Sequence, residues 1–183
     1  MLETNNHLDL HNDRKCFLRR VLRYSAKDSY VRNRSSNVMV ALPGELQALK
    51  RFHGHLGPYV VIGYKMGQIG RERFSNRISA VVFTGSKRPL SCTIDGIQFS
   101  SSCTLGKNNI VVREENQVKA EFFDEKRLLS VELVVGIRER IDATTTRDNE
   151  EQVALDLFLA PSNELFRIIE GESAQSGRIL KLR

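Results

Sequence analysis

Apolar residues recur every three or four positions along several stretches of the chain, which is the spacing of a helix that buries one face. Clusters of Gly, Pro, Ser and Asn separate these stretches and are typical of turns and linkers. In the second stretch, which begins at Pro43, the apolar stripe consists of Leu46, Leu49 and Phe52. The pattern predicts helices over residues 14–24, 43–52, 58–74, 91–102 and 147–159.

Three glycines of the 58–74 stretch, Gly63, Gly67 and Gly70, are spaced so that they share one face of the expected helix. Small residues at this spacing allow another backbone to approach closely, so this face is one hint of self-association. The alternative is glycine that the helix merely tolerates, at about 1 kcal/mol each relative to Ala.

Short runs of β-branched and apolar residues predict the strands, which cover residues 78–84, 110–113, 117–123 and 128–137. The charged residues 124–127 make the turn of an antiparallel hairpin between the last two. A short helix or turn is expected over residues 163–166, and the last dozen residues are polar. Because helices and strands are partly segregated, the sequence predicts an α+β fold, with helices packed on a mainly antiparallel sheet.

The chain has 183 residues and a net charge of +6, and this charge is unevenly distributed. Residues 1–40 hold eight Lys or Arg and four Asp or Glu, a net charge of +4, which leaves +2 for residues 41–183. We expect a basic N-terminal extension over 1–40 and one domain over 41–183. The extension is either a solvated segment or a contact for an acidic protein partner. A nucleic-acid partner is not favoured, because no known nucleic-acid module is recognisable.

Composition also narrows the protein class. No apolar run approaches the roughly 20 residues that span a bilayer, so a membrane partner is not expected. The first 30 residues lack the apolar core of a secretory signal. Three cysteines argue against a disulfide scaffold and for a reducing compartment, so a cytoplasmic location is expected.

The first candidate for chemistry is the segment His53-Gly-His-Leu-Gly-Pro58. His53 and His55 would point to opposite sides of a strand, but a turn that contains glycine lets both imidazoles converge. Neutral imidazole is a ligand for zinc, nickel, copper or iron. The alternative is a pair of helix-terminal histidines that cap carbonyl groups or face water.

The second candidate lies within residues 91–107, where Cys92, Asp95 and Gln98 share one face of an expected helix. Cys103 follows Cys92 by eleven residues. On an unbroken helix this is a rise of roughly 16 Å, too far to share one metal ion. Either the helix ends before Cys103 and the chain folds back, or only one cysteine is at the site. The alternative for each cysteine is a small buried apolar residue.

Taken together, the two segments resemble the two signatures of the FmdE family, which is named after the E component of formylmethanofuran dehydrogenase. The resemblance covers roughly residues 43–170, and the matching positions are His53, His55, Cys92, Asp95, Gln98, Cys103, Thr104 and Lys107. The family usually has Cys where this chain has Gly57, and a small residue where it has Tyr59. The C-terminal zinc finger of many members, with its paired Cys-x-x-Cys, has no counterpart here. The resemblance implies an α+β domain, often a homodimer, with a metal-associated site built from His and Cys.

The resemblance also implies roles for these residues. A divalent transition metal, zinc first and nickel or iron as alternatives, would be held by His53, His55 and Cys92. Asp95 would act as a base or would orient a ligand, and Cys103 would be a ligand or a catalytic nucleophile. Three further residues would line the pocket, with the lysine binding an anion: Gln98, Thr104 and Lys107.

The implied function is that of a metal-binding protein with an accessory or metal-dependent enzymatic role in one-carbon or redox metabolism. The chain cannot oxidise formylmethanofuran alone, because it has neither a molybdopterin-sized domain nor an iron–sulfur run of cysteines. The alternative is a non-catalytic binding or assembly module whose metal site has degenerated, as the glycine at position 57 suggests.

Overall fold

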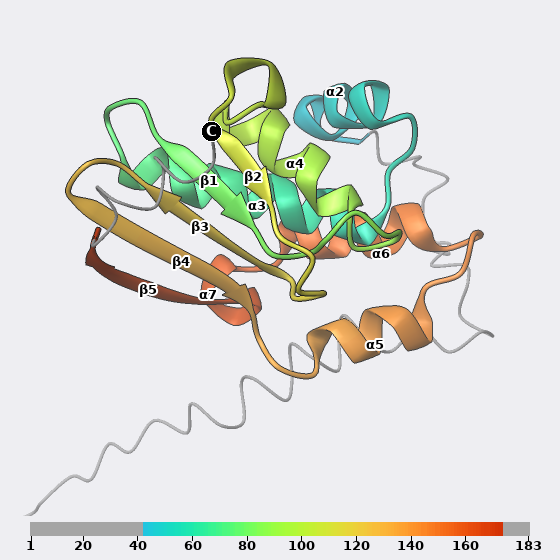
Figure 1. Cartoon of the computed structure of the whole chain (residues 1–183). Coiled ribbons are helices and arrows are strands. Elements are labelled where there is room, and N and C mark those ends of the chain that lie inside the picture. Colours follow the sequence, from blue (N-terminus) through green and yellow to red (C-terminus); the bar gives the residue numbers. More distant parts are fainter. Residues whose placement is uncertain (1–41, 174–183) are drawn as a thin grey trace, which may run out of the picture. The chain divides into compact units, whose positions relative to one another are not determined.

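A computed structural model describes residues 42–173 of the chain, and these form a layer of helices on a five-stranded sheet (Figure 1). The helix expected over 14–24, with the rest of 1–40, lies outside the described residues. The described helices are α2 (Gly44–His53), α3 (Pro58–Arg73), α4 (Cys92–Ser101), α5 (Ile137–Thr144), α6 (Glu150–Leu159) and α7 (Ser162–Leu165), with a 3-10 turn η1 (Leu105–Lys107). No helix in this part of the chain is long and apolar enough to cross a bilayer.

The sheet has the strand order β2-β1-β3-β4-β5, and every neighbouring pair except β1 with β2 is antiparallel. The predicted hairpin is confirmed: Asp124 accepts hydrogen bonds from the backbone amides of Lys126 and Arg127 and closes the turn. The strands are β1 (Ser79–Val82), β2 (Ile110–Val112), β3 (Lys119–Phe123), β4 (Arg127–Leu133) and β5 (Phe166–Glu172). The α+β fold with a mainly antiparallel sheet is therefore confirmed.

Two elements differ from the prediction. The strand expected over 128–137 ends at Leu133, and α5 begins at Ile137 after Gly136 with a φ of 89°. The apolar run continues past the end of the strand, because Val135 lies 95% exposed in the turn instead of in the sheet. The second is strand β5, for which the sequence predicts no strand: it is an edge strand with only Phe166 buried, and charged residues and a glycine interrupt its apolar residues.

The close contact of α3 with α4 fixes the helical layer. A Cβ atom on Gly63 would lie 2.0 Å from the carbonyl oxygen of Thr93, and one on Gly96 would lie 2.1 Å from that of Val60. A Cβ on Gly70 would meet the ring of Phe122 in the sheet at 2.6 Å. The glycine face is thus used inside the chain, by α4 and β3, and it no longer hints at self-association. The expected homodimer stays a prediction.

Phe52 is a third departure, because the predicted stripe of α2 is only partly buried. Leu46 and Leu49 are fully buried, whereas Phe52 is 54% exposed and contacts the ring of Phe99 on α4 at a centroid distance of 5.6 Å. The last turn of α2 therefore lies beside α4 near the surface. The end of α2, the start of α3 and the start of α4 meet at one point of the helical layer.

Candidate metal centre

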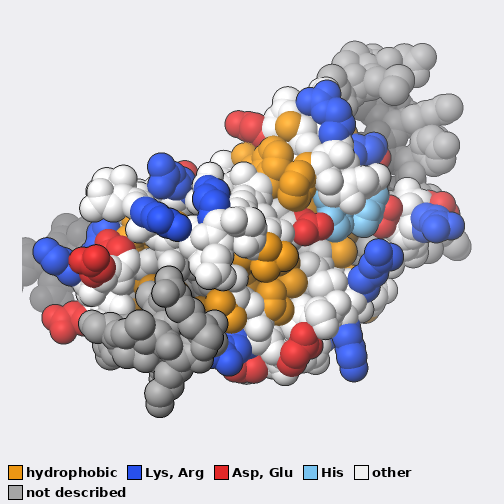
Figure 2. Space-filling model, turned by 45° about the horizontal axis from the view of Figure 1, so that its top comes forward, with side chains coloured by type: hydrophobic (Ala, Val, Ile, Leu, Met, Phe, Trp, Pro, Cys, Tyr) orange, Lys and Arg blue, Asp and Glu red, His pale blue; other side chains and the backbone are white. Residues whose placement is uncertain are grey.

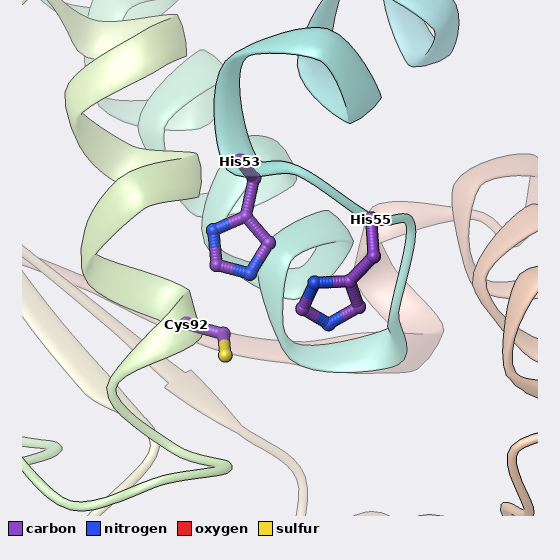
Figure 3. Close-up of side chains that lie close together, drawn as sticks. All are labelled: His53, His55 and Cys92. Carbon is purple, nitrogen blue, oxygen red and sulfur yellow. The ribbon is translucent and has the colours of Figure 1, made fainter.

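Three potential metal ligands converge where these helix ends meet (Figure 3). His53 is the last residue of α2, His55 lies in the loop that follows, and Cys92 is the first residue of α4. Each offers one ligand atom, and these atoms all lie within 4.8 Å of one another. The structure thus brings together the three residues that the sequence analysis proposed as ligands. We call this set the triad.

The loop between α2 and α3 explains why both imidazoles face the same point. Gly54 has a φ of 94°, a left-handed conformation that favours glycine, and its amide donates to the carbonyl oxygen of Lys50 at 2.8 Å. This ends α2 directly after His53. Pro58 then opens α3, where its missing N–H is not needed. In this reversal the His53 and His55 rings lie 4.6 Å apart between centroids.

Asp95 fixes the orientation of the first histidine. Nδ1 of His53 lies 2.7 Å from Oδ2 of Asp95, an acceptor, so in the neutral imidazole the proton is on Nδ1 and the free lone pair is on Nε2. Among the described residues, that Nε2 atom is buried and has no hydrogen-bond partner. A buried acceptor without a partner is destabilising by about 1–3 kcal/mol, and coordination of a cation would remove this penalty. A carboxylate that orients a ligating histidine is a common feature of metal sites, so the residues fit a metal ion.

The thiol of Cys92 is half-buried at the N-terminal end of α4. Burial, followed by the negative charge of Asp95, raises the pKa of the Cys92 thiol above its ordinary value. In the metal-free protein this thiol is therefore mostly protonated at neutral pH, and coordination of a cation would require loss of its proton.

This charge effect is testable by alkylation of metal-free protein. We expect the pH midpoint for iodoacetamide modification of Cys92 to lie above that of free cysteine, which is about 8.5. It should move to lower pH in Asp95→Asn, because the amide still accepts from His53 but no longer opposes the thiolate. Peptide mapping by mass spectrometry would follow Cys92 separately from the other cysteines. The exposed Glu115→Gln is the matched loss of one carboxylate, and an equal shift there would contradict the assignment.

A pocket of about 400 Å³ opens beside the triad and is lined by both His55 and Cys92. The histidine side chains reach the surface next to acidic and apolar side chains (Figure 2). In the pocket the hydroxyl of Tyr59 donates to Oδ1 of Asp142 at 2.5 Å. Burial and then the Asp142 carboxylate raise the pKa of Tyr59, so its hydroxyl is a neutral donor. Glu150 at the start of α6 adds a second carboxylate to the wall.

The sequence did not single out Asp142 and Glu150, because neither belongs to a local motif. Asp142 lies on α5, a helix that the sequence did not predict, because the apolar run before it extended the predicted strand to the first residue of this helix. Tyr59 was visible only as a departure from the family pattern.

Cys103 is not part of the triad. Helix α4 ends at Ser101, roughly 14 Å of helix rise from Cys92, and Ser102 follows it with a φ of 61°. Cys103 is fully buried, and its Sγ lies 3.5 Å from the carbonyl oxygen of Ile78. Burial raises the pKa of this thiol. Helix α4 does end before Cys103, but of the two cysteines in the described part of the chain only Cys92 belongs to the triad. The buried position of Cys103 gives no support to a nucleophilic role.

The three residues that were expected to line one pocket, Gln98, Thr104 and Lys107, do not lie together. Nε2 of Gln98 lies 3.4 Å from Oδ1 of Asp95, so this side chain braces the carboxylate that holds His53. Thr104 accepts from the backbone amide of Lys107 at 3.3 Å and caps η1. The Lys107 ammonium donates to the carbonyl oxygen of Ser102 at 2.6 Å. Thr104 and Lys107 therefore lie at the other end of α4 from the triad.

Comparison with known proteins agrees with this fold. Residues 52–170 match the family described as "FmdE, Molybdenum formylmethanofuran dehydrogenase operon". The crystal structure of a protein from Syntrophus aciditrophicus, described as a "tungsten formylmethanofuran dehydrogenase subunit e (fmde)-like protein", superposes with a TM-score of 0.53. It is 17% identical and covers 69% of this chain and 70% of that one, which supports the fold alone.

A curated relative from Archaeoglobus fulgidus is described as "Probable S-adenosyl-L-methionine-binding protein". It is 27% identical over 114 residues, which make up 60% of this chain and 30% of that protein. The chain thus spans less than a third of the length of this relative.

Proposed function

The chain belongs to the FmdE family, and we propose that it binds one divalent transition-metal ion, zinc above nickel or iron, through His53, His55 and Cys92. The Nε2 atom of His53 is buried, has no hydrogen-bond partner within residues 42–173 and belongs to a set of three converging ligand atoms, and this observation carries the proposal. Two imidazoles and one thiolate are a donor set that zinc accepts readily.

The surroundings favour a working site over a purely structural one. Structural zinc sites have four protein ligands, whereas sites that act on a ligand have three and an open position. Among the described residues three ligands converge here, and a pocket lies beside them. When bound, the metal would act as a Lewis acid towards a molecule in that pocket.

The chain's own residues would position that molecule. Asp95 holds His53 in the tautomer that keeps Nε2 free. The Tyr59 hydroxyl stays protonated and donates to Asp142, so this pair offers the phenolic oxygen and the second carboxylate oxygen as acceptors to a polar ligand. These features support a metal-dependent enzyme or accessory protein that handles a small polar molecule. The role in one-carbon or redox metabolism rests on the family resemblance.

The rival function is a non-catalytic binding or assembly module with a degenerate site. Gly57 favours it, because the family usually has a thiolate ligand at this position. The two functions differ in whether the purified protein holds metal.

Elemental analysis of the full-length protein, purified without an affinity tag, tests the proposal. We expect close to one metal ion per chain, and loss of it in His53→Ala/His55→Ala, because two of the three ligands are gone. The chain has four histidines, so His7→Ala/His11→Ala is a control that removes the same number of imidazoles. Thermal unfolding would verify that both variants remain folded. Protein that stays free of metal after reconstitution with zinc, nickel and iron would instead support the assembly module.

A further inference from the structure

A second concave surface lies at the other end of α4, away from the triad. It is about 680 Å³ in volume and carries three cationic side chains: Arg71 of α3, Arg77 before β1, and Lys107 of η1. Among the described residues no carboxylate lines it. We call this surface the cationic groove. Since roughly 14 Å of α4 separates its Ser101 wall from Cys92, the cationic groove is not part of the candidate metal centre.

The three cations of the groove contact backbone carbonyl oxygens and no carboxylate of the described residues. Within residues 42–173 none of them forms an ion pair, whereas Lys50, Arg73 and Arg127, for example, each do. Their hydrogen bonds go to backbone carbonyl oxygens instead. The lysine donates to Ser102 at 2.6 Å, and each arginine has one contact at 3.4 Å, from Arg71 to Asn76 and from Arg77 to Lys107. Most of the guanidinium donors are therefore available to an incoming group.

The segment that carries the lysine is held rigidly. The Asn109 side chain is buried, accepts from the backbone amide of Thr104 at 2.9 Å and donates to the carbonyl oxygen of Ile78 at 2.8 Å. Thr104 in turn caps the turn that contains Lys107. The backbone that carries Lys107 is thus positioned by the fold before any ligand arrives, which reduces the entropy lost on binding.

We propose that the cationic groove binds the phosphate group of a small molecule of about nucleotide size. Guanidinium groups match the oxygens of a phosphate with paired hydrogen bonds, and lysine adds a point charge. The hydroxyls of Ser75 and Ser102 on the rim supply neutral donors. The volume lies in the range of small-molecule sites, and the three cations gather in one concavity rather than along a stripe that would follow a nucleic-acid backbone.

This binding assigns a role to the Thr104–Lys107 end of the second sequence motif, which the metal centre does not use. It does not depend on the metal centre either. A ligand phosphate could itself coordinate a bound metal, so binding is also measured in His53→Ala/His55→Ala, where we expect it to be unchanged.

The test is calorimetric titration of the full-length protein with pyrophosphate and ATP, with adenosine as the probe that lacks phosphate. We expect binding of the two phosphate compounds and none of adenosine. Arg77→Gln and Lys107→Gln should each weaken binding about tenfold, since each removes one charged hydrogen-bond donor. Arg77→Gln is the safer variant, because Lys107 also supports the backbone at Ser102.

The double variant Arg77→Gln/Lys107→Gln is compared with Arg113→Gln/Arg140→Gln, which removes two positive charges elsewhere. Only the first should lose about a hundredfold in affinity. Equal losses in both would reduce the effect to net charge and overturn the proposal. So would the absence of binding up to roughly 10 mM ligand, which is weaker than a specific site requires. Tighter binding of a single-stranded oligonucleotide than of ATP would replace the small molecule with nucleic acid.

Discussion

Gly57→Cys is expected to tighten zinc binding by about 100-fold or more. The substitution adds a thiolate, a strong and soft ligand, to a centre that otherwise has two imidazoles and one thiolate. Loss of a residue that only orients a metal ligand already lowers affinity about 10- to 100-fold, so the gain of a direct ligand should have at least that effect.

The backbone at this position can accept the side chain. Gly57 has a φ of −116° and a ψ of 168°, an extended conformation that any residue adopts. A Cβ atom built there would lie 3.4 Å from Nε2 of His55 and touch nothing closer. The new thiol would therefore start beside one ligand of the triad and would need no change in the path of the chain.

Competition with a chromophoric chelator measures the affinity, and the visible spectrum of the cobalt-substituted protein reports an added thiolate. Gly171→Cys is the matched control, because a Cβ there meets nothing within 4 Å and lies on β5. Equal affinities in the wild type and Gly57→Cys would show that position 57 does not face the metal. With a fourth protein ligand, the variant should also lose access of small ligands to the metal, as structural zinc sites do.

The elements that could be predicted from the sequence are those with strong local periodicity. Helices α3 and α4 and the β3–β4 hairpin lie close to their predicted positions, because their apolar spacing and turn residues agree. Strand β5 could not be predicted, since its pairing with β4 is a long-range contact and charged residues and a glycine interrupt its short apolar run. Helix α5 was not predicted, because two exposed valines, Val134 and Val135, extended the apolar run of β4 and so the predicted strand.

The candidate site shows the same division. Convergence of His53 and His55 followed from the turn that Gly54 permits, and this was visible in the sequence. The rise of a helix predicted that Cys92 and Cys103 would be far apart on an unbroken helix. The sequence did not show which of the two cysteines would lie beside the histidines. The second motif is continuous in sequence, yet α4 carries its first half to the triad and its second half to the cationic groove. Only the fold shows that one motif serves two places.

Gly63→Ala and Gly96→Ala are each expected to lower the free energy of unfolding by about 3 kcal/mol or more. A methyl group at either position would lie within about 2 Å of a carbonyl oxygen on the facing helix, and backbone atoms cannot rotate away. Overpacking usually lowers the free energy of unfolding by about 1–3 kcal/mol. Because the facing atoms here belong to a helix backbone, we expect losses at the upper end of that range. For a chain of this size the melting temperature should fall by roughly 6–12 °C in thermal unfolding.

Gly44→Ala is the control for the change from Gly to Ala itself. A Cβ on Gly44 in α2 meets nothing within 4 Å, so this variant should be neutral or gain up to about 1 kcal/mol. A melting temperature for Gly96→Ala equal to that of Gly44→Ala would mean that α3 and α4 are not in backbone contact. Gly96 lies four residues after Cys92 on α4, so a forced separation of the helices also moves the thiol away from the two histidines. We therefore expect Gly96→Ala to lower zinc affinity as well as stability, whereas Gly44→Ala should leave both in place.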